Sequence, residues 1–211
     1  MRKITDLKQA LLSFLSTELA SIGFRKSYQS FYRKIPIGRQ ILHVAFIKYK
    51  YKAESKASVE IRHDELEKLY NIILGELPNT PTATIGAEFG ELLGSKSSMV
   101  WLINDTSDVP VVGTSILTAF RNVGLPFLES YASLEKIFEI LDANEFPRQS
   151  FCPIPHVRAE KAIIASYLLG QHKDYDELVT AKLGYLMSIN NPYINEFMDF
   201  TNKLKEKIKT I

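Results

Sequence analysis

The sequence lacks most of the features that identify a compartment or a chemistry. Its 211 residues include one cysteine, Cys152, so an internal disulfide is excluded and a reducing compartment fits. The formal net charge is +2, which gives no bulk attraction to nucleic acid or to a membrane. A secretory leader and an uninterrupted apolar run of about 18–20 residues are also missing. We therefore expect a soluble, cytoplasmic protein that does not bind a membrane.

Recognisable catalytic and metal-binding patterns are missing as well. The four histidines are scattered, and no two lie a helical turn apart, as paired zinc ligands on a helix do. They are His43, His63, His156 and His172. Cys152 lies near His156, where a thiolate–imidazole pair is conceivable, but a partly buried thiol in a linker is the simpler interpretation. We predict no catalytic residue, no metal and no cofactor, and an enzyme is the least supported class.

What the sequence does contain is the composition of a globular domain. Apolar residues make up 45% and charged residues 24%, values that argue against extensive disorder. The length allows one sizeable core, with or without a smaller helical appendage.

The first fifty residues indicate a helix followed by a hairpin. Apolar residues recur at three- and four-residue intervals over residues 6–22, which predicts a helix with one buried stripe. Gly23 follows, and we expect it to end that helix in the left-handed conformation. The period then changes to two. Pro36 and Gly38 predict a hairpin between strands at residues 24–35 and 40–51, the first of which a turn at 27–30 is expected to bend or split.

Shorter signals continue the pattern towards the C-terminus. Further strands are expected at residues 57–62, 82–85 and 99–103. Helices are expected at residues 64–75, 107–122, 134–141, 157–169, 175–188 and 192–209. Asp64 with Glu67 resembles a capping box, and Gly124-Leu125-Pro126 is expected to break a helix.

These elements predict an α+β fold with a predominantly antiparallel sheet of about four or five strands, packed with helices, and a C-terminal helical unit. The prolines within residues 144–155 favour a boundary there. We expect an α+β domain at residues 1–150 and a three-helix unit at 151–211 docked on it, or one continuous domain.

Several short motifs resemble a bacterial family known only as a domain of unknown function. They are Gly23-Phe24-Arg25-Lys26, Phe31 and Arg33, the strand at residues 44–49, Gly124-Leu125-Pro126-Phe127 and Ser133-Leu134-Glu135. The resemblance spans about the first 145 residues and leaves the C-terminal helices outside. It implies an α+β fold and a bacterial origin, and it supplies no activity and no catalytic residues.

Charge is distributed unevenly along the chain. Residues 23–62 hold ten Lys or Arg against two Glu, which gives +8, whereas residues 63–211 hold 13 basic and 20 acidic residues, which gives −7. Lys48, Lys50 and Lys52 are expected on one face of a single strand, at about the spacing of phosphates in an extended nucleic acid. The candidate partner-binding residues are Arg25, Lys26, Arg33, Arg39, Lys48, Tyr49, Lys50, Tyr51 and Lys52.

Three interpretations of this basic segment stay open. The lysines can simply protect an exposed sheet edge from pairing with other chains. The segment can bind a protein, as a non-catalytic interaction module of the antagonist or immunity kind. Alternatively, it can bind nucleic acid through the basic hairpin.

Overall fold

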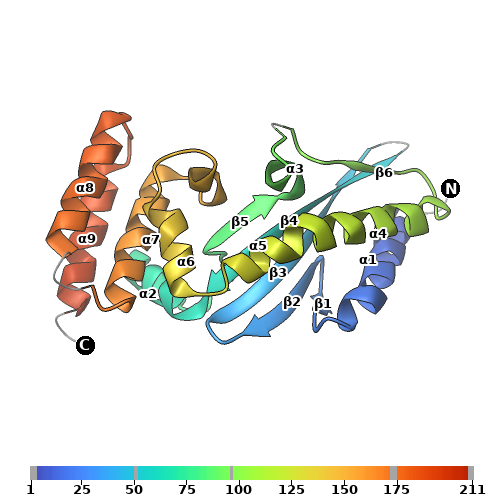
Figure 1. Ribbon diagram of the computed structural model, residues 1–211, viewed down its shortest axis with the longest axis horizontal. Coiled ribbons are helices and arrows are strands. Elements are labelled where there is room, and N and C mark those ends of the chain that lie inside the picture. Colours follow the sequence, from blue (N-terminus) through green and yellow to red (C-terminus); the bar gives the residue numbers. More distant parts are fainter. Residues whose placement is uncertain (1–3, 50–51, 96, 172–174, 209–211) are drawn as a thin grey trace. The chain divides into compact units, whose positions relative to one another are not determined.

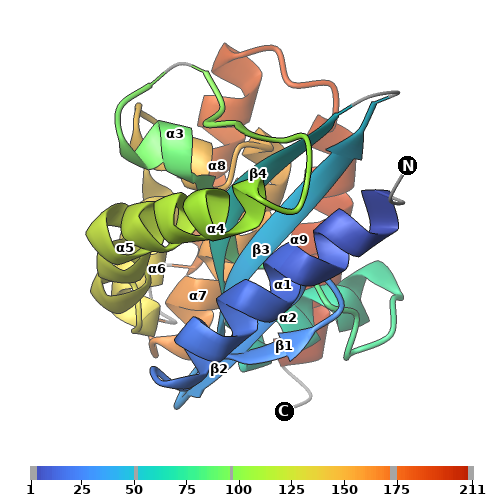
Figure 2. The same ribbon diagram turned by 90° about the vertical axis from the view of Figure 1, so that its right-hand side faces the viewer.

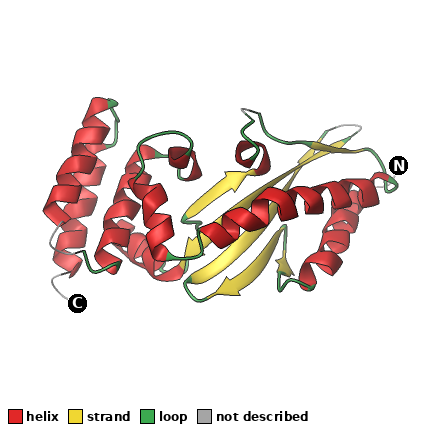
Figure 3. Cartoon of the chain, viewed as in Figure 1, coloured by secondary structure: helices red, strands yellow, loops and turns green. Residues whose placement is uncertain are grey.

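The structure is a computed structural model that describes residues 4–49, 52–95, 97–171 and 175–208. Its elements form the predicted α+β fold (Figures 1 and 3). The strands are β1 (Arg25–Ser27), β2 (Ser30–Ile35), β3 (Gly38–Lys48), β4 (Ala53–His63), β5 (Ile85–Glu88) and β6 (Trp101–Ile103). The helices are α1 (Ile4–Ala20), α2 (Asp64–Leu74), α3 (Phe89–Leu92), α4 (Asp108–Ala119), α5 (Leu125–Ser130), α6 (Leu134–Asp142), α7 (Pro155–Leu168), α8 (Tyr175–Ser188) and α9 (Ile194–Ile208), with a π-helical segment η1 (Phe120–Gly124) and a 3-10 turn η2 (Arg148–Phe151).

The described strands form one sheet of six strands. The order is β1-β2-β3-β4-β5, and β6 also pairs with β4. The pairs β1–β2, β2–β3 and β4–β6 are antiparallel, which agrees with the predicted antiparallel sheet. The strand count exceeds the expected four or five because residues 24–35 form two strands, separated by a turn at Tyr28 and Gln29.

The chain divides into two compact units. Unit 1 comprises Met1–Ile61 and Gly86–Ser130, and unit 2 comprises Arg62–Ile85 and Tyr131–Ile211. The chain therefore passes from one unit to the other within β4, within β5 and after α5. This division groups α2 and α6 with the C-terminal helices, whereas the boundary near residue 150 stays a prediction.

Unit 1 begins as its sequence indicates. The apolar stripe of α1 is buried at Leu7, Leu11, Leu15 and Leu19, and Gly23 has a φ of 86°. Both predictions are confirmed, since a left-handed residue ends the helix without the clash that a Cβ would bring. The helix α1 packs against α4 on one side of the strands (Figure 2).

A long helix in unit 1 corrects one prediction. Gly124-Leu125-Pro126 does not break it, because α4, η1 and α5 run on as one helix, Asp108–Ser130. The Leu125 N–H donates to the Phe120 carbonyl five residues back, so a π-helical turn accommodates Pro126, which has no N–H to donate. Among the described residues this is the one helix with the length and apolar composition of a membrane span. Half of its most apolar window is buried, and the core helix of a soluble protein can have the same length and composition.

Unit 2 is built around α7. This helix packs against α2, α6, α8 and α9, and every residue from Arg158 to Ser166 is buried. The predicted C-terminal helices at residues 157–169, 175–188 and 192–209 correspond to α7, α8 and α9. A helix buried on all sides needs partners for any charge it carries, and α7 carries three in succession around Ala159: Arg158, Glu160 and Lys161.

The start of α2 differs from the predicted capping box. His63 is the N-cap residue, and its ring Nδ1 accepts a hydrogen bond from the Leu66 N–H. Asp64 is the first residue of the helix, and Glu67 is fully buried. The capping-box pattern predicted Asp64 as the N-cap, but the N-cap is His63, whose ring nitrogen accepts the hydrogen bond that an Asp carboxylate usually accepts. Glu67 therefore does not belong to a capping box.

Candidate functional site

The candidate site in unit 1 lies on the side of the sheet opposite its helices. Gln40 on β3 donates through Nε2 to the Leu128 carbonyl of α5, so alternate residues of β3, beginning with Arg39, point away from the helices. The register places Lys34 opposite Arg39, Tyr32 opposite Ile41 and Ser30 opposite His43. Arg25 on β1 is opposite Tyr32. Of these residues Ser30 and Ile41 are buried, and Glu60 of β4 interacts electrostatically with His43. We call the remaining set the cationic face: Arg25, Tyr32, Lys34, Arg39 and His43.

All described helices of unit 1 pack on the other side of the sheet. The helix α1 contacts α4, and α3 and α5 both contact η1. Figure 2 shows α1 and α4 together in front of the strands. Within the described part of unit 1, no helix therefore covers the cationic face. Its side chains range from exposed at Arg25 and Lys34 to half-buried at Tyr32, Arg39 and His43.

The central feature of this face is a pair of like charges. Lys34 and Arg39 are directly opposite each other across the β2–β3 hairpin, and like charges in that position destabilise a sheet. Arg39 lies on β3, which has β2 on one side and β4 on the other. The charge of Arg39 therefore cannot protect a sheet edge. Arg25 and Lys26 lie on the edge strand β1, where edge protection does account for basic residues.

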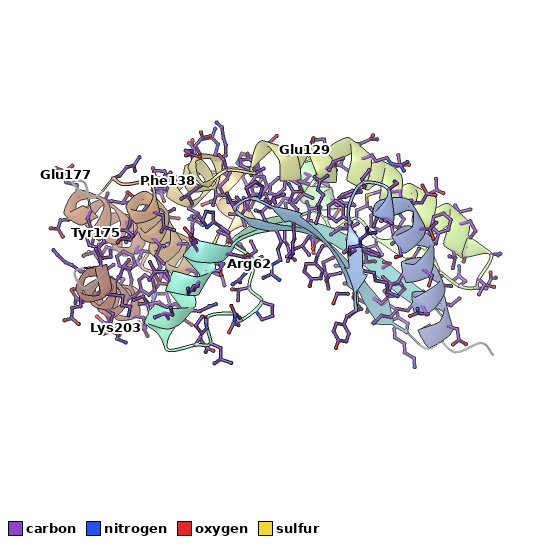
Figure 4. The ribbon with its side chains drawn as sticks, turned by 90° about the horizontal axis from the view of Figure 1, so that it is seen from below. Arg62, Glu129, Phe138, Tyr175, Glu177 and Lys203 are labelled. Atoms are coloured by element: carbon purple, nitrogen blue, oxygen red, sulfur yellow. The ribbon has the colours of Figure 1, made fainter. Side chains whose placement is uncertain are left out.

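One predicted site residue lies on the opposite side of the sheet. Arg33 pairs with Gln40 in the register, and its Nε donates to the Gln40 Oε1 at 2.7 Å. Its guanidinium lies 4.9 Å from the centre of the Phe24 ring and 3.9 Å from the Glu129 carboxylate. Glu129 is labelled on α5 in Figure 4. Arg33 thus holds β2 to its neighbours inside unit 1, and we remove it from the candidate site.

The remaining predicted residues lie at the far end of β3. Lys48 is the last residue of that strand, and the Tyr49 N–H donates to the Lys52 carbonyl. Lys50 and Tyr51 lie outside the described residues. Lys52 comes just before β4, so Lys48 and Lys52 do not lie on one strand, as was predicted for them. About ten residue steps of roughly 3.3 Å separate Tyr49 from Arg39.

Glu54 compensates the charge of one lysine between β3 and β4. The Lys52 Nζ lies 2.9 Å from a Glu54 carboxylate oxygen, and the Tyr49 hydroxyl donates to the other oxygen at 3.1 Å. The hydrogen bond from Lys52 lowers the pKa of Glu54, and the bond to Glu54 raises the pKa of Tyr49. Lys52 is therefore already paired with a carboxylate, and the cationic face is the better candidate.

A second concentration of titratable groups lies inside unit 2. We call it the buried polar cluster: Arg62, Glu67, Tyr70, Thr82, Glu160 and Lys161. The Lys161 Nζ is 2.7 Å from the Glu67 Oε1 and 2.8 Å from the Ala83 carbonyl oxygen, to which it donates. The Tyr70 hydroxyl donates to Glu160 at 3.1 Å. The Glu67 Oε1 accepts no hydrogen bond of good geometry, so its contact with Lys161 is ionic rather than directional.

Arg62 completes this cluster from the end of β4, beside the start of α2 (Figure 4). Its Nη1 donates to the Thr80 and Thr82 carbonyls and to the Thr82 hydroxyl. The Thr82 hydroxyl in turn donates to Glu67. Buried cations thereby satisfy the carbonyls of a segment without regular structure, which would otherwise be left without partners.

Burial shifts the pKa values of this cluster. Desolvation raises the pKa of Glu160 to about 7, against the hydrogen bond from Tyr70 and the charge of Lys161, which lower it. Desolvation also raises the pKa of Tyr70, and the Glu160 charge adds to that shift. Such shifts are typical of catalytic sites. Each side chain of the ionic pair is at most 5% exposed, so the pair offers a ligand no exposed group.

The cysteine and histidines form no reactive pair in the described residues. Burial raises the pKa of the Cys152 thiol, which favours an inert thiol over a thiolate. Burial lowers the pKa of His156, whose ring lies 4.3 Å from that of Tyr193 and whose Nδ1 has no hydrogen-bond partner. His172 lies outside the described residues. Within the described ranges, no group of three or more His, Cys, Asp or Glu is placed to hold a metal ion.

Sequence reasoning missed the buried polar cluster. Its members come from the end of β4, from α2, from the segment after α2 and from α7, so no spacing along the chain connects them. One signal was available: Arg158, Glu160 and Lys161 precede the apolar run from Ala162 to Ala165 within a predicted helix. A helix with charges next to such a run needs buried partners for them.

Comparison of the chain with family models, curated proteins and solved structures finds no match. The resemblance to a bacterial family of unknown function therefore stays a prediction. The site must be interpreted from its own geometry.

Proposed function

We propose that this protein is a non-catalytic interaction module, of the antagonist or immunity kind, that binds an acidic protein in the bacterial cytoplasm. The cationic face is the binding surface. The observation that supports this most directly is the position of Lys34 directly opposite Arg39. An acidic partner would add a favourable contact at each of these two like charges.

The position of Arg39 separates this proposal from edge protection. Lysines that guard a sheet edge belong on the outermost strand, and Arg39 lies on β3, between two other strands. Tyr32 lies on the same face between Arg25 and the Lys34–Arg39 pair. Tyrosine and arginine are both enriched among residues that dominate protein interfaces. The composition of the face therefore suits a protein partner.

The structure weakens the case for nucleic acid. That case depended on lysines repeating along one strand at the spacing of phosphates, whereas Lys48 ends β3 and Lys52 comes just before β4. Nucleic-acid binding becomes the alternative outcome of the experiment below.

Charge reversal tests the proposal. The variant Lys34→Glu/Arg39→Glu is compared with Lys68→Glu/Lys203→Glu, which changes the net charge equally at two exposed positions of unit 2. Binding is measured to purified products of the neighbouring genes and to an oligo(dT) strand of about 20 nucleotides. We expect one acidic protein to bind the wild type and to bind the first variant at least about tenfold more weakly, with little change for the second.

Two results would contradict the proposal. One is that both variants bind the acidic protein equally weakly, which would show that binding depends on net charge and not on the cationic face. The other is tight binding of the oligonucleotide with a steep linear fall of log affinity against log salt concentration, which would favour the nucleic-acid alternative.

A further inference from the structure

Tyr28 has a backbone conformation that a tyrosine rarely adopts. Its φ is 52°, in the left-handed region that bulky side chains avoid. The residue occupies the turn between β1 and β2, next to the paired residues Ser27 and Ser30. The other described non-glycine residue with positive φ is Asn190, and asparagine is common in that region. Tyr28 is therefore the unusual case.

The rest of the chain gives no compensation for this conformation. The side chain of Tyr28 is 93% exposed, so it gains almost nothing from burial. Within the described residues it makes no hydrogen bond, ion pair or ring contact. Glycine or asparagine would fit the turn with less strain. Exposed single aromatic residues are common, and it is the uncompensated backbone conformation of Tyr28 that points to a role outside the chain.

The neighbours of Tyr28 belong to the cationic face. Arg25 lies on the same short strand, opposite Tyr32, and β2 continues from the turn to Lys34, which is opposite Arg39. From Ser30 to Lys34 the strand covers roughly 13 Å. The turn and the cationic face therefore fit within one interface of ordinary size, whose radius is roughly 16 Å for about 800 Å² per partner.

We propose that Tyr28 is the anchor of this interface, a side chain that enters a pocket of the partner while the cationic face contacts acidic groups around that pocket. This inference rests on the proposed function and specifies the partner: an acidic protein surface with a depression that accepts a phenol ring. Tyrosine suits such a role because it supplies a large contact area with few rotatable bonds.

The test uses the full chain and a phage-displayed library of random peptides, each roughly a dozen residues long. Peptides selected on the wild type are measured against Tyr28→Gly, Tyr28→Phe and Lys34→Glu/Arg39→Glu. Asn190→Gly is the matched control, because it relieves a left-handed residue in unit 2. We expect acidic peptides, weakened at least about tenfold by Tyr28→Gly and by the charge reversal. Tyr28→Phe and Asn190→Gly should stay within about threefold of the wild type.

Thermal unfolding separates an anchor from a structural residue. If Tyr28 acts only outside the chain, Tyr28→Gly relieves strain and leaves the unfolding midpoint unchanged or higher by about 2–4 °C. A clearly lower midpoint would show that the ring supports the fold and would overturn the inference.

The failures of the two proposals are distinguishable. Acidic peptides that lose binding on charge reversal and keep it with Tyr28→Gly would overturn the anchor and leave the proposed function standing. Selected peptides that are not acidic, or that bind all variants alike, would overturn both.

Discussion

The buried carboxyl group of Glu160 makes a quantitative prediction about stability and pH. Glu160 is 3% exposed, and burial raises its pKa from 4.5 to about 7. Such a carboxyl binds its proton more tightly in the folded than in the unfolded protein. Its contribution to stability is therefore fully present below about pH 4.5 and is lost as the pH rises through about 7.

The size of the effect follows from this shift. A difference of about 2.5 pKa units, at about 1.36 kcal/mol each, amounts to at most about 3 kcal/mol. Glu160→Gln removes the titration and keeps an oxygen that accepts the hydrogen bond from Tyr70. We expect the difference in unfolding free energy, variant minus wild type, to increase by up to about 3 kcal/mol between about pH 4.5 and pH 8.

Urea denaturation followed by circular dichroism at several pH values measures this difference. Glu177→Gln is the matched control, because Glu177 is an exposed glutamate of the same unit, on α8 (Figure 4), and its difference should not vary with pH. Fluorescence of Trp101, which lies in unit 1, adds a probe outside the unit that contains Glu160. A free-energy difference for Glu160→Gln that is flat with pH, or that grows towards acid, would refute the reasoning.

Two further predictions concern buried contacts. Lys161→Met leaves Glu67 without its cation in the core, and should lower the free energy of unfolding by about 3–5 kcal/mol, whereas Lys161→Met/Glu67→Leu should recover most of that loss in the same urea titration. Gly113→Ala places a methyl group against the ring of Phe14, where α4 meets α1, and should cost about 1–3 kcal/mol. Addition of Phe14→Ala should then destabilise the protein less than it does in the wild type, and strict additivity would contradict the overlap.

Local signals accounted for most of the fold. Gly23 marked the change from helix to strand, and Pro36 with Gly38 marked the β2–β3 hairpin. Ser133 directly precedes the predicted helix at residues 134–141 and caps α6, where its hydroxyl accepts from the Lys136 N–H. Each signal depends on a few neighbouring residues, so the sequence contains it. Gly124-Leu125-Pro126 failed because tertiary packing overrides local preference: a Cβ at Gly124 would come within 3.1 Å of the side chains of Val59 and Phe89, so glycine serves close packing rather than a break.

The candidate site was less predictable because it depends on strand register and on distant partners. Alternation assigns a residue to one of two faces, and a shift of one residue exchanges them. The actual register placed Arg33 on the helix side and Arg39 on the opposite side. The partners in the buried polar cluster are farther apart still, since Tyr70 and Glu160 are separated by 90 positions. No short window of sequence contains both.

The local charge of +8 over residues 23–62 overstated the basic surface, because several of these cations are buried or paired inside the chain. Arg62 is 3% exposed and serves unit 2. Arg33 is bonded to Gln40, and Lys52 is paired with Glu54. When these three cations are left out of the count, the cationic face holds a larger share of the remaining positive charge. A total charge cannot distinguish a cation that packs inside a unit from one on a face that no described helix of its unit covers. Strand register makes that distinction, because it assigns each cation to one face of the sheet.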